Sequence, residues 1–206
     1  MEVQKKFIKD LLIHQRYNNK VAIEDGKSKL TYSNWHQHCE NISIQLMEES
    51  RYQKGRNMGI FLPNSIDYAI AYFSIAYMNR TIVPIEVTLS EKQLTSIVDY
   101  CEICTILTTS TYMDLLKQRL IKFDFGIEIY CIDTKEIYFN KKRNRPLTEE
   151  WDGNTTVNDT AIMLHTSGTT SNPKRVMLTH KNLICNIESN ICLLYTSPSP
   201  RDVEES

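Results

Sequence analysis

The sequence predicts an α/β fold with a doubly wound, mostly parallel sheet. Short apolar, β-branched runs alternate with amphipathic helical patterns along the chain, which is typical of this class. Residues 103–107 and 127–132 are apolar almost throughout, as expected for strands that are covered on both faces. A loop rich in glycine, serine and threonine follows the apolar run 161–164, as such loops do in nucleotide-binding sheets.

The first fifty residues predict a helix, a hairpin and a second helix. The opening helix has one apolar face, formed by Phe7, Ile8, Leu11 and Leu12. Two short strands, 21–23 and 30–32, flank the turn-forming pair Asp25-Gly26. We expect Ser33 to cap a helix whose apolar positions recur every three or four residues: Trp35, Cys39, Ile42 and Leu46.

The middle of the chain predicts further alternation of strands and helices. Pro63-Asn64 ends a strand at 57–62, and Ser65 caps the helix that follows. Residues 81–85 form the next strand, and Ser90 with Gln93 forms a capping box that opens a helix. A helix at 112–120 separates the strands at 103–107 and 127–132, and another helix begins after His180.

The composition is that of an ordinary soluble protein, with 41% apolar residues, 24% charged residues and a net charge of −1 over 206 residues. No basic excess favours nucleic acid as a partner, and no apolar run approaches the roughly 20 residues that span a bilayer. We expect a cytoplasmic protein without a secretory signal or a transmembrane segment.

Two local patterns have alternative interpretations. The pair Cys101 and Cys104 has the spacing of a redox or zinc motif, but no second Cys/His pair follows, so we expect buried, reduced thiols and no metal site. Residues 134–158 mix lysine and arginine with Tyr138 and Phe139, a pattern that also occurs in nucleic-acid contacts. Turn formers in this segment favour a solvated connecting loop.

The segment 166–174 has the composition of a phosphate-binding loop. Its small residues let backbone N–H groups and hydroxyls approach an anion closely, and a lysine ends it. A Ser/Thr-rich linker is the alternative, although linkers rarely lie between an apolar strand and an amphipathic helix. The loop lacks the Gly-Lys-Ser/Thr ending of the P-loop of kinases and GTPases. We expect these residues to bind the nucleotide: Thr166, Ser167, Gly168, Thr169, Thr170, Ser171 and Lys174.

This segment, continued by Val176-Met177-Leu178-Thr179-His180, resembles the signature of the adenylate-forming (AMP-binding) superfamily. That family includes acyl-CoA synthetases, adenylation domains of nonribosomal peptide synthetases, and luciferases. The resemblance extends over residues 3–191, through Pro63-Asn64-Ser65 and Val83-Pro84-Ile85. Ser171 and Arg175 stand where the family usually has glycine.

The resemblance implies an ATP-dependent acid–thiol ligase that forms an acyl-adenylate and passes the acyl group to coenzyme A. It implies ATP and Mg²⁺ as cofactors and a carboxylic acid, first of all a fatty acid, as substrate. The family's adenine, ribose and catalytic-lysine motifs do not occur here, so we expect no catalytic residue in this chain and no ligase activity from it alone. Alternatives are part of an amino-acid adenylation domain, or a non-catalytic nucleotide-binding or interaction protein.

We expect two segments of different origin. Residues 1–192 would form the N-terminal part of an adenylation domain, with its parallel sheet truncated. Residues 193–206 contain Ser-Pro-Ser-Pro and break the helical pattern, so we expect a non-native tail that lacks a place in the fold. A natural Ser/Pro linker is the alternative.

Overall fold

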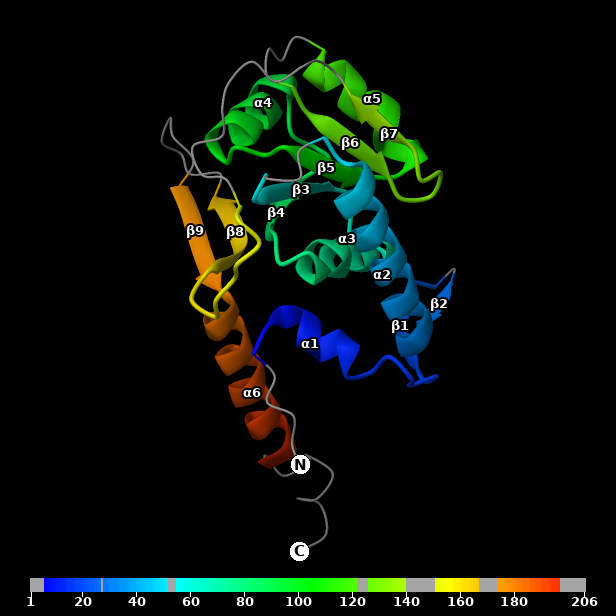
Figure 1. The fold of residues 1–206 in the computed structure, drawn as a ribbon, viewed down its shortest axis with the longest axis vertical. Coiled ribbons are helices and arrows are strands. Elements are labelled where there is room, and N and C mark those ends of the chain that lie inside the picture. The colour runs from blue at the N-terminus through cyan, green and yellow to red at the C-terminus, as the bar shows by residue number, and fades with distance from the viewer. Residues whose placement is uncertain are drawn as a thin grey trace, which may run out of the picture.

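A seven-stranded sheet with helices on both faces dominates the fold (Figure 1). The computed structural model describes residues 6–26, 28–51, 55–121, 126–139, 151–166 and 174–196. The strand order is β7-β6-β5-β3-β4-β8-β9. The five inner strands pair in parallel, and the two edge strands β7 and β9 pair antiparallel to their neighbours. The predicted doubly wound, mostly parallel sheet is confirmed.

The N-terminal elements form as predicted, with one correction. Helix α1 (Ile8–Ile13) precedes strands β1 (Val21–Glu24) and β2 (Lys29–Thr31), which pair in a separate two-stranded sheet. Helix α2 (Tyr32–Glu49) is capped by the side chain of Thr31, which accepts a hydrogen bond from the N–H of Asn34. The prediction that Ser33 caps this helix was wrong, because the chain turns helical directly after the extended Thr31.

The centre of the sheet is tightly packed. Strand β3 (Asn57–Phe61) pairs with β4 (Thr81–Ile85), and helix α3 (Ile66–Tyr77) connects them after the predicted Ser65 cap. Gly59 lies midway along β3. A Cβ atom at this position would be 2.8 Å from Cδ1 of Ile85 and 3.1 Å from Cγ1 of Ile106. Side chains of the two neighbouring strands therefore fill the space that glycine leaves at this position.

The next two helices, α4 (Glu91–Tyr100) and α5 (Ser110–Leu120), cover the other face of the seven-stranded sheet. Helix α4 begins at the predicted capping box, in which Ser90 accepts from the Gln93 N–H and the Gln93 side chain accepts from the Ser90 N–H. Strands β5 (Thr105–Thr108) and β6 (Glu128–Cys131) are buried at every residue and flank helix α5. This continuous burial is the physical reason for their unbroken apolar pattern.

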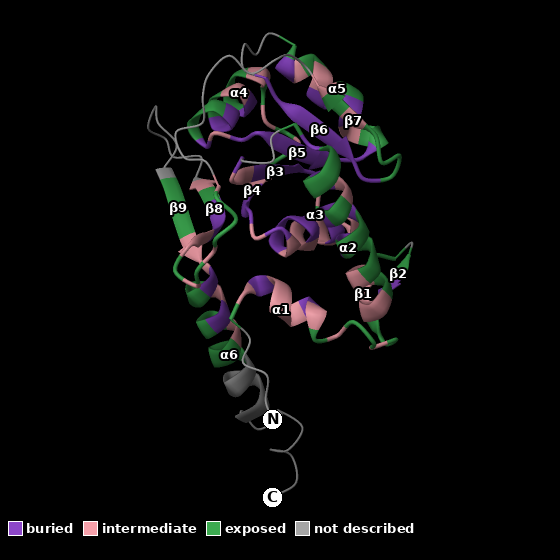
Figure 2. Cartoon of the chain, in the orientation of Figure 1, coloured by how far each residue is buried: buried purple, intermediate pink, exposed green. Residues whose placement is uncertain are grey.

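Two apolar cores lie on the two faces of the sheet, and Figure 2 shows the buried strands between partly exposed helices. Ile60 and Ile82 point into the core formed with α1, α2 and α3. Their neighbours Phe61 and Val83 point into the core formed with α4 and α5. Alternate residues of a strand face opposite sides, so each strand supplies both cores.

The last part of the described chain contains two strands that the sequence did not predict. Strand β7 (Ile137–Phe139) lies inside the segment expected to be a loop, and it pairs with β6. Strand β9 (Lys174–Thr179) pairs with β8 (Thr160–Thr166). Both are edge strands, stabilised by a neighbour from elsewhere in the chain rather than by a local pattern.

Helix α6 begins at His180, as predicted, and extends to Thr196. It includes the first four residues of the predicted tail, and residues 197–206 lie outside the described residues. The origin of that segment stays a prediction. Within the described part of the chain, every helix is too short or too polar to cross a membrane.

Candidate functional site

The β8–β9 hairpin places the two ends of the predicted phosphate loop side by side. Its ladder runs from Thr160 opposite Thr179 to Thr166 opposite Lys174. Thr166 is the last residue of β8, and Lys174 is the first residue of β9. Because β8 is parallel to β4, the loop leaves the sheet at the carboxyl ends of the parallel strands, where nucleotide sites of such sheets lie.

Of the predicted site residues, the structure describes only the two at these ends. Thr166 and Lys174 are brought together as a paired position of the ladder. Ser167, Gly168, Thr169, Thr170 and Ser171 lie outside the described residues, so their role in nucleotide binding stays a prediction.

Arg175 stands where the adenylate-forming family usually has glycine. Its side chain points to helix α4. Its Nη1 donates to the carbonyl oxygen of Tyr100 at 3.1 Å, and the guanidinium lies 4.1 Å from the centre of the Tyr100 ring. Tyr100 is the last residue of α4, where a positive charge is favoured by the helix dipole. Arg175 therefore joins β9 to α4.

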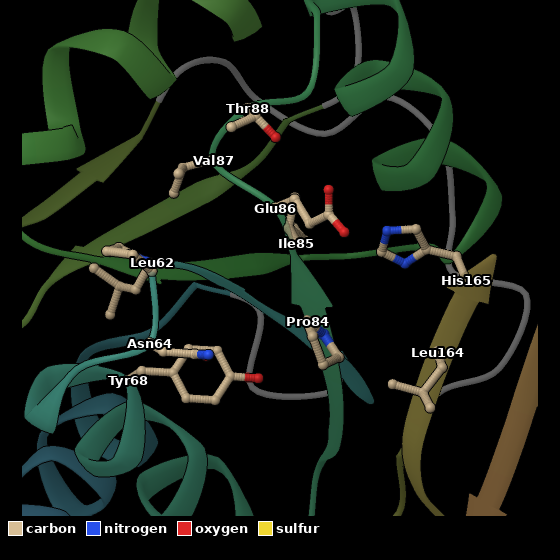
Figure 3. Close-up of a pocket in the computed structure, with 11 residues that line it drawn as sticks. Leu62, Asn64, Tyr68, Pro84, Ile85, Glu86, Val87, Thr88, Leu164 and His165 are labelled. Atoms are coloured by element: carbon tan, nitrogen blue, oxygen red, sulfur yellow. The ribbon is translucent and has the colours of Figure 1, made fainter. Parts of the chain in front are cut away.

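A pocket of about 410 Å³ opens at the carboxyl ends of β3, β4 and β8 (Figure 3). Its walls are mostly apolar, formed by Leu62, Pro63, Pro84, Ile85, Val87 and Leu164. Its polar groups come from Asn64, Tyr68, Glu86, Thr88 and His165. None of these five side chains makes a hydrogen bond or an ion pair with another described residue through its polar atoms. A concave, mainly apolar site with a few convergent polar groups is the usual form of a small-molecule site.

The turn between β3 and α3 positions Asn64 and Tyr68. The Ser65 hydroxyl donates to the carbonyl oxygen of Pro63 at 3.1 Å and accepts from the Tyr68 N–H at 3.1 Å. This cap fixes the first turn of α3, so the half-buried Tyr68 ring lies against the pocket, with its hydroxyl toward Pro84 (Figure 3). Burial raises the pKa of Tyr68, which keeps the phenol protonated at neutral pH.

A turn after β4 positions Glu86. The N–H of Leu89 donates to the Glu86 carbonyl oxygen at 3.3 Å. Nη1 of Arg119, from α5, donates to the carbonyl oxygen of Val87 at 2.7 Å. These two bonds hold the backbone of the turn, while the Glu86 carboxylate remains exposed at the pocket.

His165 lies next to the last residue of β8 and faces Glu86 across the pocket (Figure 3). Burial lowers the pKa of His165, and the nearby Glu86 carboxylate acts in the opposite direction. Its Nδ1 atom is buried and has no hydrogen-bond partner among the described residues. A buried polar atom without a protein partner is uncommon in folded proteins, so this nitrogen is available to a ligand.

The cysteine pair does not form a reactive site. Cys101 and Cys104 are buried and free. Burial raises the pKa of Cys101 to about 11, which disfavours the thiolate needed for redox chemistry or metal binding. Cys185, on α6, is exposed.

Tyr138 and Phe139 of the basic segment each lie against a cation of the chain. The guanidinium of Arg51 lies 3.8 Å from the ring centre of Phe139, and Nζ of Lys117 lies 4.4 Å from that of Tyr138. Residues 140–150, which include Lys141, Lys142, Arg143 and Arg145, lie outside the described residues.

The sequence did not single out the pocket, because its residues come from three separate segments and most have ordinary structural roles. The available signal was indirect. Pro63-Asn64 was predicted to end one strand and Ile85 to end the next, and parallel strands end at the same edge of a sheet.

Comparisons with known proteins agree with this arrangement. The sequence model of the family described as "AMP-binding enzyme" matches residues 13–203. The chain is 31% identical over 181 residues to the hybrid PKS-NRPS synthetase poxE of Penicillium oxalicum, covering 85% of this chain and 4% of that protein. It is 27% identical over 180 residues to the crotonobetaine/carnitine–CoA ligase of Citrobacter koseri, covering 81% of this chain and 35% of that protein.

Solved structures share the fold. The luciferase-like enzyme of the mealworm Zophobas morio has a TM-score of 0.73 at 18% identity, covering 93% of this chain and 47% of that chain. The McyG A-PCP structure with phenylalanyl-adenylate also has a TM-score of 0.73 at 18% identity, covering 96% and 36%. The chain thus spans less than half the length of these relatives. With the family model matched over most of its length, the chain belongs to the AMP-binding enzyme family.

Proposed function

We propose that this chain supplies the phosphate-binding part of an ATP-dependent enzyme that activates a carboxylic acid as its acyl-adenylate. The observation that carries the proposal is the pairing of Thr166 with Lys174 at the carboxyl end of β8. In this proposal the small residues between them would close around an anion at the edge of the sheet where nucleotides bind. Membership of the AMP-binding family supports the same reaction.

In this proposal the chain stabilises charge and takes no covalent part in the reaction. Hydroxyl and N–H groups of Thr166, Ser167, Thr169 and Thr170 would donate to the β- and γ-phosphates, with Ser171 completing the loop. Gly168 would permit close approach, and Lys174 would balance the charge that develops on pyrophosphate. Magnesium would bridge phosphate oxygens of the nucleotide.

Coenzyme A is the acceptor we propose, with a fatty acid as the first acid to test. The relative from Citrobacter koseri, a CoA ligase by name, supports the acceptor. We also propose a cytoplasmic location, supported by the four buried, free cysteines among the described residues.

A nucleotide titration tests the proposed loop. We expect the chain to bind ATP with Mg²⁺ and the Lys174→Ala variant to bind about tenfold more weakly, because a charge-assisted contact with phosphate is lost. Lys181→Ala removes the same charge from an exposed position of α6 and is the matched control. Equal binding by all three proteins would refute a role of the loop in phosphate binding.

A turnover assay tests the expectation that the chain alone is inactive. We expect no carboxylate-dependent release of pyrophosphate above that of Lys174→Ala, because the family's adenine, ribose and catalytic-lysine motifs do not occur in this sequence. Turnover above this control would show that the chain by itself contains a complete active site.

Part of an amino-acid adenylation domain is a second candidate, because the relative at 31% identity is a PKS-NRPS synthetase. An exchange assay between pyrophosphate and ATP on the longer protein, with panels of amino acids and fatty acids, separates the two. A non-catalytic binding protein is the third, and it predicts that the chain is a stable, soluble monomer on its own. An open sheet edge would instead cause aggregation.

A further inference from the structure

The pocket at the carboxyl ends of β3, β4 and β8 is distinct from the predicted phosphate loop in its chemistry. The described residues that line it include no lysine or arginine, whereas a phosphate site needs positive charge. Glu86 is the one charged residue among the described residues of its lining. This described lining therefore favours a cation over an anion.

Arg119, which contacts the turn beside this pocket, has a structural role. Arg119 donates to the carbonyl oxygen of Val87 and lies 5.9 Å from the centre of the Phe61 ring. No ion pair between Arg119 and Glu86 forms among the described residues. The Glu86 carboxylate can thus accept hydrogen bonds from a ligand.

Three acceptors are available to a ligand in this pocket. The Glu86 carboxylate and the His165 imidazole point toward each other across it (Figure 3). The buried Nδ1 of His165 lacks a partner among the described residues, and burial keeps the ring neutral, so one ring nitrogen can accept a hydrogen bond. The Tyr68 hydroxyl lies at the same pocket.

We propose that this pocket binds a small organic cation, an ammonium group on a short apolar body. The ammonium would donate to Glu86 and His165, because its three N–H groups need acceptors and a carboxylate is the strongest one present. The apolar body would lie against Leu62, Pro84 and Leu164, which line the other side. The site adjoins the start of the phosphate loop and uses none of its residues.

Ligand-observed NMR with the full chain tests this site with three probes of one shape: butylammonium, butanol and butyrate. We expect butylammonium to bind about threefold to tenfold more tightly than butanol, and butyrate more weakly than either, because the carboxylate attracts one and repels the other. Addition of butylammonium should also shift the ring resonances of His165. Equal binding of the three probes, preference for butyrate, or an unmoved His165 would overturn the proposal.

Two variants locate the effect. Glu86→Gln should reduce the preference for butylammonium over butanol to about onefold and should fold normally, because Glu86 is exposed and its carboxylate bonds to no described residue. Glu188→Gln removes the same charge from an exposed position of α6 and should leave the preference unchanged. An identical result for both variants would assign the preference to the net charge of the protein and reject the pocket. These experiments contain no nucleotide, so their outcome is separate from that of the proposed adenylating activity.

Discussion

The amino ends of the central strands and the pocket at the carboxyl ends of β3, β4 and β8 differ in how their polar side chains are bonded. At the amino ends, Asn57 donates to the carbonyl oxygen of Cys101 at 2.7 Å, and Thr81 donates to that of Thr160 at 2.9 Å. Glu128 is fully buried and accepts from the Arg51 N–H and the Thr105 hydroxyl. At the carboxyl ends of β3, β4 and β8, the polar side chains of the pocket have no such partners among the described residues.

This difference separates stability from function within one sheet. A buried polar group that is bonded inside the protein stabilises one arrangement and offers nothing to a ligand. A polar group without an internal partner adds little stability and remains available for binding. We therefore expect substitutions at the amino ends to reduce the free energy of unfolding, and substitutions at the carboxyl ends to change ligand binding.

The largest effect is expected at Glu128. Glu128→Ala would leave the part-buried Arg51 N–H and the buried Thr105 hydroxyl without this acceptor and open a cavity, which should reduce the free energy of unfolding by about 3 to 4 kcal/mol. Urea unfolding followed by circular dichroism measures this loss. Glu128→Gln retains one carbonyl acceptor and should lose less. A loss below about 1 kcal/mol in the alanine variant would show that this network contributes little.

The next effect on stability depends on pH and concerns His180. This residue is 1% exposed, and its Nδ1 accepts a hydrogen bond from the Ile8 N–H. Burial lowers the pKa of His180 to about 4, so the folded protein keeps it neutral while the unfolded chain takes up a proton near pH 6.5. This contribution is complete above pH 6.5 and is lost as the pH falls toward 4, by about 2 to 3 kcal/mol in total.

Comparison with the His180→Gln variant isolates the contribution of His180 to the pH dependence of stability. Glutamine does not titrate, and the carboxyl groups are common to both proteins. The difference in unfolding free energy between the two proteins should shrink from pH 7 to pH 4. A difference that stays constant over this range would contradict the assignment.

A smaller effect is expected at Asn57. Asn57→Ala removes the bond to the Cys101 carbonyl oxygen that ties the start of β3 to the end of α4, and should cost about 1 kcal/mol. Thermal unfolding detects a change of this size. Asn64→Ala, at the carboxyl end of the same strand, is the matched control and should leave the melting temperature almost unchanged. Equal losses in the two variants would remove the distinction between the ends of β3.

The smallest effect is expected for Tyr68→Phe, which deletes a hydroxyl that bonds to no described residue. The free energy of unfolding should change by less than about 0.5 kcal/mol, measured in urea. A loss above 1 kcal/mol would indicate that the hydroxyl has an internal role and that the pocket is less free for ligands than we infer.

Local patterns predicted most of the fold because each central strand and its caps carry their own signal. Ser65 and Ser90 were recognisable as caps, and β5 and β6 as strands covered on both faces. Strand β7 was missed because its three residues depend on pairing with β6. Strand β9 was missed for the same reason, since β8 provides its only partner among the described strands.

The candidate site was predictable only in part. The loop between Thr166 and Lys174 was predicted from its composition. The β8–β9 hairpin that holds its two ends together was not predicted. The pocket depends on the proximity of Tyr68, Glu86 and His165, which are far apart in the sequence. Such proximity follows from the order of strands in the sheet, and the sequence pattern alone does not specify that order.

The pairing of β4 with β8 has a consequence for how the chain folds. Ile82 lies opposite Ile162, eighty positions later in the sequence, whereas β3, β4, β5 and β6 follow one another closely. Contacts between distant residues require the closure of long loops and therefore slow folding. Until β8 arrives, the apolar edge of β4 remains open to pairing with another molecule. Refolding yield should thus fall with rising protein concentration, and the β8–β9 hairpin should be the last part of the sheet to acquire protection from hydrogen exchange.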